Sequence, residues 1–321
     1  MTTMIDEAES GLSTEATEQL RTTTAAVRLS ISWLGVRKTL TPGQKAEAAE
    51  SFGAEGQFLS AGKKLLDVSH PAFKAVTAVR TKAVGFWKAE TLPFPEPGLR
   101  LIRRDRIEAF GDRMQDWSLE LDDAVANLDQ HYAELKQAAA GRLGSLFNPA
   151  DYPALLIGAF QLAWDFPSVE PPDYLRRLHP ELYEQECRRV QARFDEAVQL
   201  AEQAFVEELQ KLIAHLTERL AGTEDGTPKV FRNSVVDKLT EFFERFTELN
   251  VGLNAELERL VNHARQIVRG VDPQMLRENS SLRNQIAQEL SGVQTVLDDL
   301  LVDRPRRNIL RRPQQPSQED S

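Results

Sequence analysis

Two long series of apolar residues at helical spacing constrain this chain more than any other feature of its sequence. The first runs from Ile107 to Leu135, and its members recur about every 3.5 residues, the heptad spacing of coiled coils. The second runs from Cys187 to Leu220 at a spacing of about 3.67 residues, close to an eleven-residue repeat. We therefore expect residues 105–140 and 180–220 to lie side by side as a long antiparallel coiled-coil arm.

Short alternating segments before and between these helices predict a small β-sheet. Residues 27–36 and 159–166 alternate between apolar and polar side chains, which is the pattern of a half-buried strand. Residues 58–66 and a weaker stretch at Leu99 and Leu101 are further candidates. The predicted fold class is mainly α with a small antiparallel β-sheet, a long antiparallel coiled-coil arm and a C-terminal helical region.

Composition suggests where these regions begin and end. The first residues are rich in Thr, Glu and Ser, and the stretch AGTEDGTPK has the composition of a flexible linker. We expect a disordered N-terminal tail at 1–22, a small α+β core with the helical arm at 23–220, a linker at 221–230, a helical region at 231–303 and a basic disordered tail at 304–321.

The C-terminal region carries a third apolar series, across residues 235–267. It passes through Gly252 without losing phase, so a single helix is expected there. Three aromatic residues in this series, Phe242, Phe243 and Phe246, stand at the spacing of core residues. Packing inside the molecule is the favoured interpretation, and a docking face for a protein partner is the alternative.

The stretch GQFLSAGKKLLD resembles a phosphate-binding loop but has the wrong spacing. Five residues separate Gly56 from Gly62, where that motif has four, and Lys64 replaces the hydroxyl residue that holds Mg²⁺. A strand after a glycine-rich turn is the simpler interpretation. We therefore predict that this segment binds no nucleotide.

Other sites of chemistry are not indicated by the sequence. The histidines form neither the Glu-x-x-His pattern of carboxylate-bridged metal bundles nor a zinc-binding His-x-x-x-His pair. Cys187 is the single cysteine, and its place in an apolar series is typical of a core residue. We expect no cofactor, no metal ion and no enzymatic activity.

Charge and the terminal sequence bear on location and partners. The net charge of −10 argues against general binding to nucleic acid, because phosphates are repelled except at local basic patches. The single thiol fits a reducing compartment, and the first residues contain neither a basic region nor an apolar run. We expect a cytoplasmic protein with no membrane segment.

A basic cluster near the C-terminus is the second candidate for partner binding. Five arginines fall within nine residues, and no acidic residue interrupts them. They are either a solvated chain end or a short electrostatic handle for phosphate or for an acidic protein surface. The residues are Arg304, Arg306, Arg307, Arg311 and Arg312.

Three segments together resemble an uncharacterised family of bacterial and phage proteins with long predicted coiled-coil helices. They are LSISWLGVRKTL, FGAEGQFLSAGKKLLD and LFNPADYPALLIGAFQLAWDFPSVEPPDYLRRL, with a weaker similarity at DRPRRNIL. The resemblance covers about residues 25–220. Genes of that family often lie near those for MoxR-type AAA ATPases and von Willebrand factor A-type proteins. The resemblance implies a phage or mobile-element setting and an adaptor role beside an ATPase, and it implies no catalytic residues.

The function predicted from the sequence is that of a non-enzymatic helical interaction or adaptor protein, whose protein partners include an AAA ATPase. The alternative is a nucleic-acid-associated phage or plasmid protein that uses the C-terminal arginine tail. Long helical seams with aromatic positions are often completed by a second copy, so a homodimer is also expected.

Overall fold

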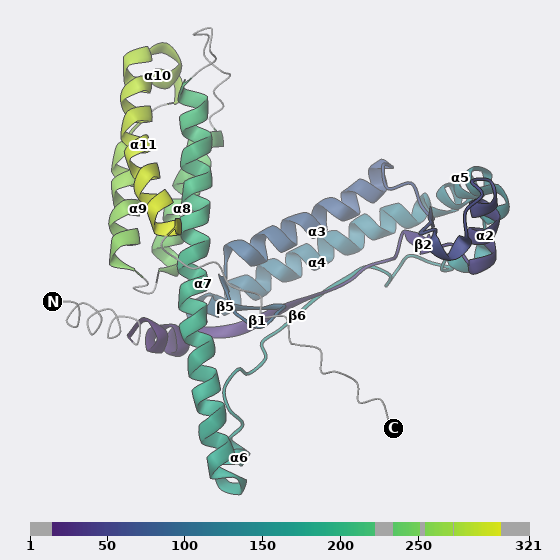
Figure 1. The fold of residues 1–321 in the computed structure, drawn as a ribbon, viewed down its shortest axis with the longest axis horizontal. Coiled ribbons are helices and arrows are strands. Elements are labelled where there is room, and N and C mark those ends of the chain that lie inside the picture. Colours follow the sequence, from purple (N-terminus) through teal and green to yellow (C-terminus); the bar gives the residue numbers. More distant parts are fainter. Residues whose placement is uncertain (1–14, 222–233, 251–253, 272, 303–321) are drawn as a thin grey trace. The chain divides into compact units, whose positions relative to one another are not determined.

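The chain divides into two compact units, residues 1–198 and 199–321. The division falls inside helix α7 (Pro180–Ala221) and not at the predicted linker, residues 221–230. Helices predominate over two small antiparallel sheets, so the mainly α class is confirmed (Figure 1). The computed structural model describes residues 15–221, 234–250, 254–271 and 273–302.

The first unit is built on a four-stranded antiparallel sheet with the strand order β4-β5-β1-β6. In register, Leu29 lies opposite Trp164 and Ile31 lies opposite Leu162, which places the apolar residues of both strands on one face. The two alternating segments of the sequence therefore pair with each other. The strands are β1 (Thr24–Ser32), β4 (Leu92–Pro93), β5 (Leu99–Arg103) and β6 (Gln161–Asp165).

Helices α3 (Pro71–Ala89) and α4 (Ile107–Gln130) pack side by side over that apolar face (Figure 1). Helix α3 begins at Pro71, and the His70 side chain caps it by accepting a hydrogen bond from the backbone N–H of Ala72. The apolar series of α4 is buried against α3 and the sheet. Its buried members are Phe110, Met114, Trp117, Leu121, Val125 and Leu128.

The predicted long coiled-coil arm of residues 105–140 with 180–220 is not confirmed. Helix α4 takes α3 as its partner, because α3 has an apolar stripe of its own and only the short hairpin of β4 and β5 separates the two helices. The predicted single helix through residue 140 is also interrupted at His131, after which α5 (Tyr132–Leu143) begins. The His131 ring lies 5.2 Å from that of His70.

Residues 15–23 form a helix that precedes β1 directly, so the predicted disordered tail is wrong for this part. Ala16 and Leu20 stand one helical turn apart and are both buried. The Thr17 hydroxyl donates a hydrogen bond to Oδ1 of Asp195 at 2.7 Å. The polar composition of residues 15–23 does not indicate this helix, because its apolar face consists of Ala16 and Leu20 alone. Residues 1–14 lie outside the described residues.

The part of α7 in the first unit also packs through an aromatic contact. The Phe194 ring is buried and lies 5.5 Å from the ring of Phe94 in an edge-on arrangement. The predicted helix of residues 180–220 is confirmed in extent by α7, although its partners differ from those expected. The short helix α6 (Asp173–Leu178) precedes it.

The second unit is a group of packed helices that begins with the C-terminal part of α7. Arg265 of α9 donates hydrogen bonds to the carbonyl oxygen of Phe243 and to Thr247 of α8. Glu208 of α7 pairs with Arg245 of α8, and α9 also packs against α11. The helices are α8 (Ser234–Leu249), α9 (Ala255–Val268), α10 (Pro273–Glu278) and α11 (Ser280–Val302).

The predicted single helix across residues 235–267 is wrong. Helix α8 ends at Leu249, and α9 begins at Ala255. The Asn254 side chain accepts hydrogen bonds from the backbone N–H groups of Glu256 and Leu257, which are donors that a continuous helix would satisfy itself. An asparagine N-cap therefore starts a new helix, although the apolar phase continues across the break.

Candidate interaction surface

A long excursion from a small β-hairpin is the most unusual element of the first unit. Strands β2 (Arg37–Thr39) and β3 (Gly62–Lys64) pair antiparallel, and residues 40–61 connect them. This connection contains helix α2 (Pro42–Glu50) and a 3₁₀ turn, Gly56–Phe58. We call residues 36–65 the hairpin insertion (Figure 1).

The structure of the hairpin insertion distinguishes between the two interpretations of the segment GQFLSAGKKLLD, which we call the glycine-lysine segment. The predicted strand of residues 58–66 is present only as β3, because Phe58 belongs to the 3₁₀ turn. A phosphate-binding loop leads into a helix, whereas Gly62 here begins a strand that pairs with β2. The geometry is therefore not that of a phosphate-binding loop.

Local interactions fix the backbone of the excursion. Thr41 and Gln44 form a capping box, in which each side chain accepts a hydrogen bond from the backbone of the other. Helix α2 ends near Gly53, whose φ of +62° is in the left-handed region that favours glycine. The backbone of Gly56 packs so closely on α2 that an added Cβ would lie 2.9 Å from the Cα of Ala46.

Two phenylalanines of the excursion face solvent, although its backbone makes these local contacts. Phe52 and Phe58 are each 82% exposed. Ala49 is the single buried residue of α2, so the excursion has almost no core of its own in which these rings could be buried. Full burial of a phenyl side chain contributes about 1.5–3 kcal/mol, which is not gained here.

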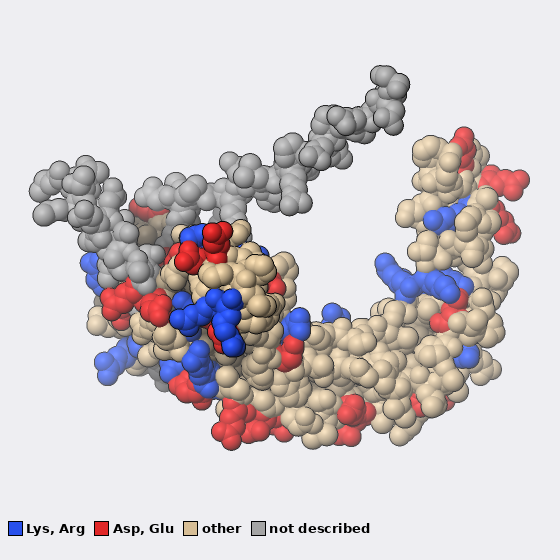
Figure 2. Space-filling view, turned by 90° about the horizontal axis from the view of Figure 1, so that it is seen from below, with Lys and Arg blue, Asp and Glu red and all other residues tan. Residues whose placement is uncertain are grey.

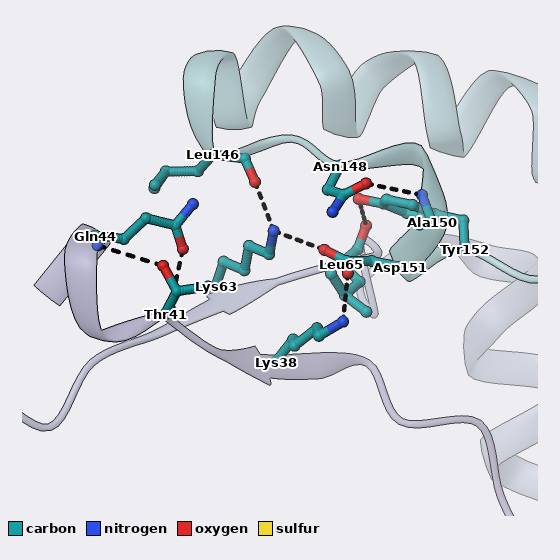
Figure 3. Close-up of polar contacts among 10 residues, drawn as sticks. All are labelled: Lys38, Thr41, Gln44, Lys63, Leu65, Leu146, Asn148, Ala150, Asp151 and Tyr152. Carbon is teal, nitrogen blue, oxygen red and sulfur yellow. Dashed lines mark hydrogen bonds and ion pairs between the residues drawn. The ribbon is translucent and has the colours of Figure 1, made fainter.

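An ion-pair cluster in which Asp151 and Lys63 are buried and Lys38 is exposed attaches the hairpin to the rest of the unit (Figure 3). The Asp151 carboxylate lies between two lysines of the hairpin: its Oδ1 is 2.5 Å from Nζ of Lys38, and its Oδ2 is 2.6 Å from Nζ of Lys63. The Lys63 ammonium also donates to the carbonyl oxygen of Leu146 at 2.6 Å. The side chains of Asp151 and Lys63 are only 2% and 6% exposed. We call this cluster the Asp151 clamp.

The sequence around Asp151 positions its carboxylate. Asn148 accepts a hydrogen bond from the backbone N–H of Ala150 and so caps the short turn Pro149–Asp151. The Tyr152 hydroxyl donates to the carbonyl oxygen of Leu65 at 2.9 Å, next to β3. Hydrogen bonds from Lys38 and then Lys63 hold the pKa of Asp151 below its ordinary value.

A second pair of exposed apolar side chains follows the clamp. Leu155 and Ile157 face solvent, whereas Leu156 between them is fully buried. The backbone N–H of Leu156 donates to Oδ1 of Asp129, and the carbonyl oxygen of Pro153 accepts from the hydroxyl of Tyr132. This loop therefore also presents apolar side chains from a fixed backbone. The sequence does not distinguish the exposed residues from the buried one, because LLI is a continuous apolar run.

The three aromatic residues predicted as a possible docking face are core residues of the second unit. Phe242, Phe243 and Phe246 are all buried. The ring of Phe205 lies 6.1 Å from that of Phe242 and 5.0 Å from that of Phe246. The docking interpretation is corrected accordingly, because their apolar surface is already covered within the unit. The favoured interpretation, packing inside the molecule, agrees with this burial.

The other sequence-based candidates are not placed by the structure. Arg304, Arg306, Arg307, Arg311 and Arg312 lie outside the described residues, so their role stays a prediction, as does the homodimer. Within the described ranges, no three His, Cys, Asp or Glu side chains form a group that could hold a metal ion. Cys187 is half-buried on α7.

The sequence did contain a signal for Phe52 and Phe58. Residues 42–56, PGQKAEAAESFGAEG, hold small and charged residues with no apolar periodicity, so a helix there has no face with which to bury a neighbouring ring.

Among the helices of the described part of the chain, none is both long and apolar enough to cross a membrane. Comparison of the chain with protein-family models, curated proteins and solved structures gave no match.

Proposed function

We propose that this chain is a non-enzymatic interaction protein, an adaptor that binds a protein partner through the hairpin insertion. The observation that carries the proposal is the 82% exposure of both Phe52 and Phe58 on an element with a fixed backbone. Large aromatic side chains dominate the energetics of protein interfaces, and two on one small element can form the centre of a contact.

The attachment of the hairpin insertion supports this function. Affinity is lost when an interface has to be ordered on binding, and a preorganised surface avoids that cost. The Asp151 clamp and the Tyr152–Leu65 hydrogen bond hold β2 and β3 in place. The capping box and the close contact of Gly56 with Ala46 hold the excursion between them.

The class of partner is suggested by the resemblance of the sequence to the phage-related coiled-coil family. That resemblance favours a MoxR-type AAA ATPase from the same organism as the partner, with this chain as the adaptor. The second unit contributes a compact group of helices to the adaptor, and its aromatic residues stabilise its core.

The test removes both rings at once and compares the variant with a matched control. Phe52→Ser/Phe58→Ser deletes the proposed contact, while Leu119→Ser/Leu178→Ser deletes two other exposed apolar side chains of the same unit. Tagged full-length proteins are expressed in cells, and the co-purified proteins are quantified by mass spectrometry. At about 1.5 kcal/mol or more per buried ring, the first variant should weaken binding of the partner by at least about 100-fold.

The control should retain the same partner, and thermal unfolding should show that all three proteins are folded. Recovery of an ATPase with the wild type and the control but not with Phe52→Ser/Phe58→Ser would support the adaptor. Equal recovery of every co-purified protein by all three chains would remove the hairpin insertion from the proposal.

A further inference from the structure

Two cations stand directly opposite each other on the outer side of the hairpin. Arg37 of β2 is in register with Lys64 of β3. The backbone N–H of Leu65 bonds to the carbonyl oxygen of Val36, and that of Leu40 bonds to that of Ala61. Hydrogen-bonded pairs alternate along an antiparallel ladder, so Arg37 and Lys64 form a non-hydrogen-bonded pair.

Such pairs hold their Cα atoms about 4.5 Å apart, the closest approach that a sheet allows. Like charges placed directly opposite destabilise a sheet. A hairpin whose strands have three residues each has few other pairs that could offset this repulsion. An anion bound between Arg37 and Lys64 would relieve this repulsion.

The two sides of the hairpin differ in how their charges are compensated. Lys38 and Lys63, which alternate with the outer pair, both contact the Asp151 carboxylate. Arg37 and Lys64 are exposed, and neither has an acidic partner among the described residues. The inner cations thus serve the attachment of the insertion, and the outer cations remain available to an external anion.

We infer that the hairpin insertion binds an acidic segment of its protein partner, with carboxylates on Arg37 and Lys64 and apolar side chains on Phe52 and Phe58. The inference rests on the proposed function and specifies the chemistry of the partner. The guanidinium fork of Arg37 suits a carboxylate in two-point contact, and the ammonium of Lys64 adds a second point charge.

A protein segment fits this surface better than a nucleic acid does. Three exposed acids, Glu47, Glu50 and Glu55, lie on the same excursion, and Figure 2 shows acidic and basic side chains together at the end of the unit that carries β2 and α2. These acids repel a polyanion more strongly than a segment with one or two carboxylates. A phosphate backbone carries regularly spaced charges and needs a track of cations. Two cations within a chain of net charge −10 match one or two carboxylates instead.

The experiment selects binders from a library of random peptides displayed on phage, using the full chain as bait. The wild type is compared with Arg37→Gln/Lys64→Gln, with Phe52→Ser/Phe58→Ser and with Lys74→Gln/Lys88→Gln. The last variant removes the same number of exposed positive charges from α3 and is the matched control. The most enriched peptide is then synthesised, and its Kd is measured by fluorescence anisotropy at low and physiological salt, beside a labelled oligothymidylate.

Peptides enriched by the wild type should combine acidic and apolar residues. Their Kd should rise about 10-fold in Arg37→Gln/Lys64→Gln and stay within about twofold in the control. The Arg37→Gln/Lys64→Gln variant should melt at or above the wild-type temperature, since it loses a repulsion, so misfolding does not explain the change.

Two further outcomes separate this inference from the proposed function. Enriched peptides that are apolar without acidic residues, and that still depend on Phe52 and Phe58, would overturn the inference and leave the interaction surface standing. A second outcome would also overturn the inference: the oligothymidylate binds in a way that depends on Arg37 and Lys64, and no acidic peptide is enriched. The partner would then be a nucleic acid. If every enriched peptide binds the wild type and Phe52→Ser/Phe58→Ser equally, or if none is enriched, both the inference and the proposed function are contradicted.

Discussion

The ammonium group of Lys63 lies 2.6 Å from Oδ2 of Asp151, and both side chains are almost completely removed from solvent. Lys63 is part of β3, whereas Asp151 is the last residue of the short turn Pro149–Asp151, which lies after α5 in the chain. The contact therefore joins two segments that are distant in sequence and fixes the hairpin insertion to the unit. The contact between Lys63 and Asp151 therefore sets the position of any binding surface on the hairpin insertion.

Replacing Asp151 by Asn tests the clamp. The amide cannot neutralise Lys38 and Lys63, and it leaves the Lys63 ammonium buried without an ion-pair partner. We expect a clear fall in melting temperature, measured by circular dichroism. Asp165→Asn breaks the pair with Arg28, in which both side chains are half-exposed. It is expected to change the melting temperature little. Equal shifts for the two variants would show that the clamp contributes no more than a surface pair.

The clamp also predicts a dependence on pH. The pKa of Asp151 is lowered by its bonds from Lys38 and Lys63, so its contribution to stability is complete above the ordinary aspartate pKa of about 3.9. That contribution is lost as the pH falls through the lowered pKa. The difference in melting temperature between wild type and Asp151→Asn should stay constant from about pH 7 to 5 and shrink below about pH 4. A difference that already shrinks between pH 7 and 5 would contradict this assignment.

The two lysines of the glycine-lysine segment should behave differently when each is replaced by Ala. Lys63→Ala removes one partner of Asp151 and should lower the melting temperature, whereas Lys64→Ala removes an exposed cation and should not. Neither variant should change nucleotide binding, which we expect to be undetectable by calorimetry in the wild type as well. Micromolar ATP binding that either substitution abolishes would reverse the interpretation of this segment.

Phe194→Asp should disrupt the contact of α7 with Phe94. The substitution places a carboxylate where a ring is buried, and we expect a loss of about 3 kcal/mol or more in the free energy of unfolding. Leu119→Asp, on the exposed side of α4, is the control and should change little. Urea unfolding gives both values, and similar midpoints for Phe194→Asp and the wild type would place Phe194 outside the core.

Local signals in the sequence predicted several elements correctly. The capping box at Thr41, the Asn148 cap and the alternating strands β1 and β6 each follow from residues close together in the chain. The long apolar series of α7 likewise predicts a helix that the structure confirms. Such features depend on backbone hydrogen bonds and helical periodicity, which short stretches of sequence determine.

The choice of packing partners could not be predicted in the same way. The apolar series of α4 and α7 are both long and both have a spacing seen in coiled coils, yet α4 packs against α3. The apolar phase across 235–267 continues through a break that the Asn254 cap makes. Arg37 and Lys64 become opposed only once β2 and β3 pair across the excursion, so the surface that we propose depends on tertiary structure.

Photo-crosslinking in cells shows whether the hairpin insertion contacts a partner protein. A benzoylphenylalanine replaces Phe58 in one full-length chain and exposed Leu119 in a control chain, and crosslinked products are identified by mass spectrometry. We expect a product with a distinct partner protein from position 58 and none from position 119, with crosslinked partner residues that lie in an acidic segment. Equal labelling from both positions, or a position-58 product that is only a second copy of this chain, would contradict it.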